Sequence, residues 1–178
     1  HNCPDFYSGD GKFTTRLNIK FLKFINNFFF LDRTKKYLDF IGLNYYFAER
    51  HFGFGFHATN PDKHRNDLCW SMEPARISNV VNDIWCRYKL PVMITENGVA
   101  NSGDKYRKWW IGETLKELIK LKKKGVGLIG YIHWSLLDNF EWAEGHWPKF
   151  GLIAVDRETM QRKVRPSAKW FGSIIQRI

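Results

Sequence analysis

Three short segments of this 178-residue chain, 39–46, 91–95 and 127–134, constrain its fold more than any other feature. Each is dominated by apolar and aromatic residues, as in strands that are buried on both faces. Such strands are typical of a parallel sheet that helices cover. Helices are predicted between them, over 75–89 and 106–124. Strands that alternate with helices predict an α/β fold.

The remaining segments complete a single domain that spans residues 1–178. A long loop is predicted over 51–69, which is rich in Gly, His, Asn and Asp, and a loop or short hairpin over 138–164. A final helix is predicted over 166–177. An amphipathic helix is predicted over 13–30 from the helical spacing of Leu17, Phe21, Phe24, Ile25 and Phe28.

Each predicted strand ends in polar or aromatic residues: Asn44 and Tyr46, then Glu96, then Trp134. In a β/α barrel the chemistry lies at these carboxyl ends of the strands. Three strands cannot close a barrel, because eight are needed. If the outer two stood alone they would be open apolar edges prone to aggregation. Either further strands come from elsewhere or the chain forms a small open α/β sheet.

The formal net charge of +10 raises the possibility of a nucleic acid or an anionic membrane as partner. The basic residues are scattered apart from a run at 120–124, which ends a predicted helix before Gly125. Cations there complement the helix dipole, so we favour a solvated helix end. The longest apolar stretch, near 28–31, is too short to span a membrane. We therefore expect neither a nucleic-acid nor a membrane partner.

The chain has three cysteines and no CxxC pair, so neither a disulfide framework nor a zinc site is predicted. His57, His64 and His133 also lack the spacing of metal ligands. We expect no metal and no cofactor. Reduced thiols are the default for a cytosolic protein, and no signal peptide is recognised at the start, so a cytoplasmic location is predicted.

Glu96 directly follows a buried strand and is expected to face a cavity, although an ion pair or a helix N-terminus could also explain it. Hydrolysis of a glycoside uses two carboxylates that flank the bond. A nucleophilic carboxylate must stay ionised, and donors from Asn44 and Tyr46 would favour that form. Glu141 and the indoles of Trp134 and Trp142 follow the third strand. They suit sugar hydroxyls and ring faces, whereas core packing is the alternative for each indole.

Five segments carry a specific resemblance: 39–46, 94–98, 134–142, 150–156 and 165–171. In this order and spacing they resemble the C-terminal part of glycoside hydrolase family 1, the β-glucosidases and β-galactosidases. The resemblance implies a (β/α)8 TIM barrel in which the three strands are the sixth, seventh and eighth. A partner polypeptide would complete that barrel.

The resemblance also implies roles for individual residues. Glu96 matches the catalytic nucleophile, Tyr46 the residue that hydrogen-bonds to it, and Asn44 a position beside it. Four further residues match the substrate-binding positions of the terminal sugar: Trp134, Glu141, Trp142 and Phe150. The pair Glu141-Trp142 is similar to that of members that act on unphosphorylated sugars.

Several elements of the family are absent from the sequence, including the first-strand Gln and the His-Trp pair that bind the terminal sugar from the N-terminal half. The acid/base Glu of the family lies in an Asn-Glu-Pro motif, which does not occur here. Glu73-Pro74 is rejected as a substitute, because it belongs to a Trp-x-x-x-Pro element that begins at Trp70. The sequence therefore predicts the C-terminal subunit or fragment of a split retaining β-glycosidase acting on terminal β-D-glucosides or galactosides. A separate N-terminal half-barrel chain would supply the acid/base in a heteromeric assembly. The alternative is a non-catalytic sugar-binding or scaffold remnant.

Overall fold

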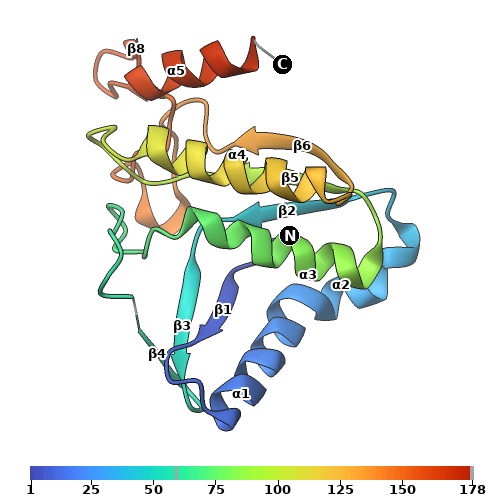
Figure 1. Cartoon of the computed structure of the whole chain (residues 1–178). Coiled ribbons are helices and arrows are strands. Elements are labelled where there is room, and N and C mark those ends of the chain that lie inside the picture. The colour runs from blue at the N-terminus through green and yellow to red at the C-terminus, as the bar shows by residue number, and fades with distance from the viewer. Residues whose placement is uncertain (59, 177–178) are drawn as a thin grey trace.

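The computed structural model describes residues 1–58 and 60–176, and a parallel sheet lies at its centre (Figure 1). Among these residues the sheet has three strands in the order β2 (Ile41–Tyr45), β5 (Val92–Asn97) and β6 (Leu128–His133). Both pairings are parallel. The three strands predicted from the sequence, and their parallel arrangement, are confirmed.

Helices α3 (Ile77–Tyr88) and α4 (Arg107–Lys123) cover one face of this sheet (Figure 1). A short 3-10 turn, Pro74–Arg76, leads into α3. The main core lies between the two layers and includes Ile41, Leu43, Ile94, Ile77, Val81, Ile84, Ile111 and Leu118. The predicted helices 75–89 and 106–124 are thereby confirmed, with boundaries that differ by one or two residues.

The other face of the sheet is less covered than the sequence predicted. Along β2, Ile41, Leu43 and Tyr45 are buried, whereas Gly42 and Asn44 between them are only half-buried. Successive side chains of a strand point to opposite faces. The half-buried row is therefore the one that faces away from α3 and α4.

The two edges of the sheet differ. The outer edge of β2 is partly paired, since Cys3 N donates to Asn44 O at 2.9 Å and Asn44 N donates to His1 O at 2.8 Å. At the other end of the sheet, Ile129 and Ile132 of β6 are exposed. The predicted open apolar edge is thus found at β6, whereas the N-terminal residues cover the edge of β2.

A second, smaller sheet joins β1 (Asp5–Ser8), β3 (Ala48–Phe52) and β4 (Phe56–Ala58). β1 runs parallel to β3, and β4 runs antiparallel to it. The prediction of a loop over 51–69 is wrong for its first part, because β3 and β4 form a hairpin there. Gly53 and Gly55, both with positive φ, make the tight turn between the strands.

The predicted helix 13–30 is present but is longer and less regular. It consists of α1 (Phe13–Lys23), a π-helical turn (Phe24–Phe28) and α2 (Phe29–Thr34), followed by a 3-10 turn (Lys35–Tyr37). Its amphipathic pattern is real, but most of the apolar side is exposed. The side that packs on the chain carries Thr15, Asn18 and Asn27, and only Phe28 and Leu31 pack against the main core among the apolar residues of the described segment 13–34.

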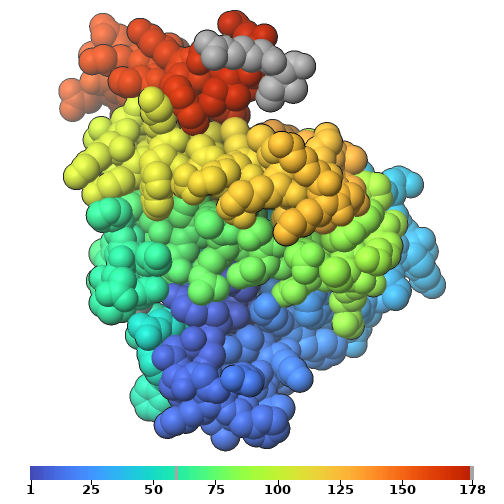
Figure 2. Space-filling model, in the orientation of Figure 1, coloured from blue at the N-terminus to red at the C-terminus, as the bar shows by residue number. Residues whose placement is uncertain are grey.

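The C-terminal region stacks onto α4 (Figure 2). After a 3-10 turn, Trp142–Glu144, the segment 138–164 contains the antiparallel hairpin β7 (Ile153–Val155) and β8 (Arg162–Val164), as predicted. α5 (Pro166–Ile175) packs with Trp170 against Gly112 of α4. Residue 177, where the last helix was predicted to end, lies outside the described residues. Within the described ranges, no helix has the length and apolarity needed to cross a membrane.

Candidate active site

A cavity of about 440 Å³ lies at the carboxyl ends of β2, β5 and β6. It is lined by all seven residues predicted from the sequence: Asn44, Tyr46, Glu96, Trp134, Glu141, Trp142 and Phe150. Asn2, Cys3, Pro4, Phe47 and Trp70 complete its wall. Residues that are 106 positions apart in the chain therefore meet in one place, because parallel strands end at the same side of a sheet.

Glu96 and Tyr46 form the central contact of the cavity. The Tyr46 hydroxyl donates a hydrogen bond of 2.6 Å to Glu96 Oε2. Burial raises the pKa of Tyr46 far above its ordinary value, and the bond to Glu96 raises it further. Tyr46 therefore keeps its proton and remains a donor. The bond fixes the orientation of the Glu96 carboxylate in the cavity.

Asn44 lies beside this pair but makes a different contact. Its Oδ1 accepts a hydrogen bond of 2.7 Å from the Thr95 hydroxyl. The register between β2 and β5 shifts at Leu43/Asn44, and this shift sets Asn44 opposite Glu96. The strand irregularity thus brings Asn44 level with Glu96, and the bond to Thr95 fixes the amide there.

Trp134 and Glu141 form the second polar pair. The Trp134 indole N–H donates to Glu141 Oε1 at 3.2 Å. Burial raises the pKa of Glu141, and the negative charge of Glu96 adds to this effect. Two carboxylates thus share one cavity closely enough to affect each other. An indole and a carboxylate side by side offer both a donor and an acceptor to vicinal hydroxyls of a sugar.

Trp142 and Phe150 line the same cavity but differ in their exposure to solvent. The Trp142 side chain is 83% exposed at the rim. Phe150 is buried, and its ring makes an edge contact with Tyr46 at a centroid distance of 6.0 Å. Trp70 completes this aromatic group, 6.3 Å from Tyr46. Phe150 and Trp70 therefore pack against the ring of Tyr46.

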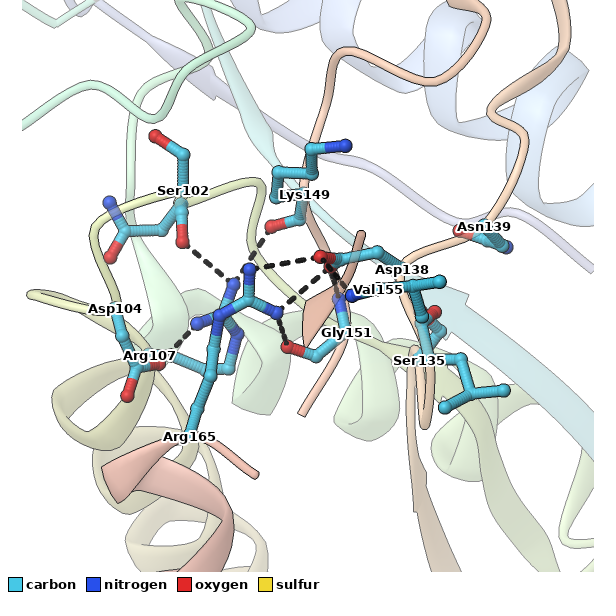
Figure 3. A network of polar contacts seen from close by, with 12 residues as sticks. Ser102, Asp104, Arg107, Ser135, Asp138, Asn139, Lys149, Gly151, Val155 and Arg165 are labelled. Carbon is cyan, nitrogen blue, oxygen red and sulfur yellow. Dashed lines mark hydrogen bonds and ion pairs between the residues drawn. The ribbon is translucent and has the colours of Figure 1, made fainter. Parts of the chain in front are cut away.

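A buried ion pair supports the segment that carries Trp134 and Glu141 (Figure 3). The Asp138 carboxylate accepts from both terminal nitrogens of Arg165, at 2.9 and 3.0 Å, and from Gly151 N at 2.9 Å. Arg165 also donates to Gly151 O. This pair joins the segment after β6 to the residue that precedes α5.

Arg107 forms a second support close by (Figure 3). It is paired with Asp104 and donates to the backbone carbonyls of Asn101 and Lys149 at 2.8 Å. Asp104 in turn accepts from Ser167 at the start of α5. The loop after Glu96 and the segment before Phe150 are therefore tied to the same two helices.

The turn after Glu96 lies directly against Trp134. Asn97 is buried, donates to Tyr45 O at 2.7 Å and accepts from the Trp110 indole at 2.9 Å. A Cβ atom at Gly98 would overlap the Trp134 carbonyl group. Only glycine fits here, and its absence of a side chain lets β5 and β6 approach at the site.

Several of these residues were missed by sequence reasoning. Asp138 and Arg165 lie inside matching segments, but nothing in the sequence pairs them. Asn2 enters the cavity only because residues 1–3 run beside β2, a long-range pairing that no local pattern reveals. Trp70 begins the Trp-x-x-x-Pro element, and this is the sequence signal that could place it at the site.

Glu73 lies elsewhere, in agreement with its rejection as a catalytic residue. It accepts from the Tyr7 hydroxyl and from Arg76 Nε, both at 2.9 Å, and is buried. It lines a larger cavity of about 660 Å³ that contains none of the seven predicted site residues. In the part of the chain that the structure describes, no group of three or more His, Cys, Asp or Glu side chains is arranged to hold a metal.

Curated proteins are similar to this chain in sequence. The chain is 37% identical over 151 residues to a chloroplastic galactolipid galactosyltransferase of Arabidopsis thaliana, covering 83% of this chain and 24% of that protein. It is 37% identical over 155 residues to a β-glucosidase of an Agrobacterium species, covering 77% of this chain and 34% of the relative.

Solved structures agree with these relatives. A β-glucosidase from Thermotoga maritima in complex with glucoimidazole has a TM-score of 0.88 and 27% identity, covering 98% of this chain and 49% of that one. A β-glycosidase from Pyrococcus horikoshii has a TM-score of 0.89 and 30% identity, over 97% and 46% of the two chains. The predicted fold, the C-terminal part of a (β/α)8 barrel, is confirmed.

The chain spans less than half the length of the solved enzymes and about a quarter to a third of the curated relatives above. The profile of glycosyl hydrolase family 1 matches residues 28–178, well over half of the chain. The chain therefore belongs to glycosyl hydrolase family 1.

Proposed function

We propose that this chain is the C-terminal subunit or fragment of a split retaining β-glycosidase that acts on terminal β-D-glucosides or galactosides. The observation that carries the proposal is the 2.6 Å hydrogen bond from Tyr46 to Glu96 in a cavity that also holds the Trp134–Glu141 pair. Relatives with the names β-glucosidase and β-galactosidase support this class of substrate.

In the proposed reaction a Glu96 carboxylate oxygen attacks the anomeric carbon while the bond to the leaving oxygen breaks. A glycosyl ester on Glu96 results, and the leaving oxygen takes a proton from a Glu of the partner chain. That Glu then removes a proton from water, whose oxygen attacks the anomeric carbon and releases Glu96. In such enzymes the two carboxyl groups lie about 5–5.5 Å apart.

The other residues of the cavity bind and orient the sugar. The Glu141 carboxylate accepts hydrogen bonds from two hydroxyls of the terminal sugar, and the Trp134 indole forms the floor. Trp142 at the rim donates its N–H to the same sugar. Tyr46 keeps Glu96 oriented toward the anomeric carbon. This division of roles needs no metal and no cofactor.

A separate N-terminal half-barrel polypeptide supplies the proton donor in this proposal. Two facts support it: the 178 residues contain no Asn-Glu-Pro motif, and the described sheet provides three of the eight strands of the barrel. The active site then forms where the two polypeptides meet.

A substrate whose leaving group needs no proton tests the nucleophile without the partner. The chain is incubated with 2,4-dinitrophenyl β-D-glucoside, and the glucosyl adduct is located by peptide mass spectrometry. We expect the adduct on Glu96 and none in Glu96→Gln. An adduct on another residue contradicts the proposal. The absence of any adduct, both with the chain alone and with its partner, also contradicts it.

A non-catalytic sugar-binding or scaffold role is the second candidate, and the absence of an Asn-Glu-Pro motif favours it. The same cavity would then bind the sugar through Glu141 and the indoles. Binding of glucoimidazole by calorimetry, together with no adduct on Glu96 under any condition above, would establish this role instead.

A further inference from the structure

The first turns of the N-terminal helical segment pack on the chain through polar side chains, whereas Phe28 and Leu31 near its end pack against the main core. Gly53 N donates to the Thr15 hydroxyl at 2.7 Å, and Asn18 Nδ2 donates to Gly53 O at 3.0 Å. Asn27 Nδ2 donates to Pro4 O at 3.1 Å. All three side chains are buried. These bonds fix the rotation of the helix about its axis, so the opposite side must point away from the chain.

That opposite side is apolar and exposed. We call it the phenylalanine face, and it consists of Phe13, Leu17, Phe21, Phe24, Ile25, Phe29 and Phe30. The exposed fractions of Phe13, Phe21 and Phe24 are 73%, 60% and 41%. A single exposed apolar residue is ordinary, whereas a stripe at helical spacing marks an interaction surface.

The phenylalanine face has a positive border. Residues 11–31 contain no Asp or Glu but four basic residues. Lys23 turns inward to Asp5 and Asp83, whereas Lys12, Arg16 and Lys20 are exposed. A surface that fits here is therefore apolar in its centre and acidic at its rim, because complementary charges face each other across an interface.

The position of the face indicates what covers it. The helix follows residues 1–3, which pair along the edge of β2, and the edge at β6 lies at the far end of the sheet. Figure 2 shows this helix at the opposite end of the molecule from α5. In a closed barrel, helices on neighbouring strands pack side by side. The chain covers 49% of the Thermotoga maritima enzyme, so about half of the length of that enzyme has no counterpart in this chain.

We infer that the phenylalanine face docks a helix of the N-terminal half-barrel polypeptide, through an apolar stripe with an acidic rim. The inference rests on the proposed function, since the occupant is the polypeptide that supplies the proton donor. It adds the surface and the chemistry by which the two halves recognise each other.

The probe is the N-terminal segment of Thermotoga maritima β-glucosidase that this chain does not match, and calorimetry measures its binding to the full chain. The test variant combines Phe13→Ser, Phe21→Ser and Phe24→Ser. The control combines Phe56→Ser, Ile119→Ser and Trp109→Ser, whose side chains are 75%, 52% and 41% exposed. Far-UV circular dichroism checks that both variants fold.

We expect at least about tenfold weaker binding for the test variant and less than about a twofold change for the control. Equal binding by the test variant and the unsubstituted chain overturns the docking surface and leaves the split enzyme standing. Failure of the unsubstituted chain to bind the segment also overturns the docking surface. The adduct experiment on Glu96 decides the proposed function separately.

Two further outcomes assign the face to a different occupant and overturn the inference. Light scattering could show a dimer of the chain that dissociates in the test variant only, which would make a second copy the occupant. Vesicles of phosphatidylcholine with phosphatidylglycerol could bind the chain through the same three phenylalanines and not the segment. The face would then be a membrane contact.

Discussion

At the residue scale, the hydrogen bond from the Tyr46 hydroxyl to Glu96 Oε2 is the contact on which the proposed reaction depends most directly. The burial that raises the pKa of Tyr46 makes the phenol a permanent donor at any ordinary pH. Because Tyr46 stays protonated, it donates a hydrogen bond to the Glu96 carboxylate and does not become a second negative charge beside it. Phe150 and Trp70 pack around the phenol and limit its rotation.

Tyr46→Phe removes the hydroxyl that bonds to Glu96 and keeps the ring that packs against Phe150. A hydrogen bond to a charged group contributes about 1.5–3 kcal/mol, so we expect glucosyl-Glu96 to form roughly 10- to 100-fold more slowly. Intact-mass kinetics with the dinitrophenyl glucoside measures this rate. An unchanged rate would show that the bond has no part in the reaction.

We expect the free energy of unfolding to depend on pH because of the buried imidazole of His133. Burial, with a contribution from the Arg107 charge, lowers its pKa to about 3. An unfolded histidine has a pKa of about 6.5, so the unfolded state takes up a proton first as the pH falls. Stability is therefore complete above about pH 6.5 and declines below it, by about 2 kcal/mol between pH 7 and pH 5.

His133→Phe keeps an aromatic ring beside Phe171 and removes the titration. Urea unfolding at pH 7 and pH 5 measures the loss in the unsubstituted chain and in this variant. We expect the loss to be about 2 kcal/mol smaller in the variant. Equal losses in the two proteins would mean that His133 does not titrate on unfolding.

At the scale of elements, burial decides what an ion pair contributes. Arg165–Asp138 is buried at 2.9 Å, whereas Lys120–Glu117 on α4 has a shorter distance of 2.6 Å but an exposed lysine. Arg165→Met leaves a buried carboxylate uncompensated, which costs about 3–5 kcal/mol. Lys120→Met should cost less than about 1 kcal/mol. Urea unfolding of both variants checks the contrast, and similar losses would contradict it.

The elements that the sequence predicted well are those whose pattern is local. The strands that became β2, β5 and β6 are short and apolar, and Pro74 marked the start of the helical region of α3. The hairpin of β3 and β4 was missed because its glycines and histidines have the composition of a loop. The orientation of α1 was hidden because it depends on bonds from Asn18 to Gly53, 35 residues away.

The candidate site also contains some contacts that the sequence could predict and others that it could not. Glu96 and Tyr46 could be paired from the sequence because both follow strands that were recognised. The contact of Asn44 with Thr95 could not, since it depends on a register shift between two strands. The ion pair of Asp138 with Arg165 requires the folded path of the segment between them.

At the scale of the whole molecule, the described sheet is an arc of a barrel with helices on one face only. The rate of the proposed reaction then depends on the assembly, and the size of this dependence differs between leaving groups. Dinitrophenolate departs without a proton, whereas an alkoxide needs a general acid, which contributes about 10²- to 10⁴-fold.

We therefore expect the N-terminal half-barrel to accelerate hydrolysis of methyl β-D-glucoside by about 10²- to 10⁴-fold and the first step with dinitrophenyl β-D-glucoside only slightly. Stopped-flow release of dinitrophenolate and a coupled assay for glucose measure the two rates, each with and without the half-barrel. The same acceleration of both substrates would place the effect of the half-barrel in binding or folding instead of proton donation.

The close approach of Gly98 to the Trp134 carbonyl means that the turn after Glu96 and the segment that carries Trp134, the proposed nucleophile and sugar floor, cannot be altered independently. Any side chain at position 98 must push the two strand ends apart, so a change made for its effect on the sugar also moves Glu96. In laboratory evolution of sugar preference, useful substitutions should accumulate around Glu141 and Trp142. Position 98, which reaches no sugar, should remain glycine throughout.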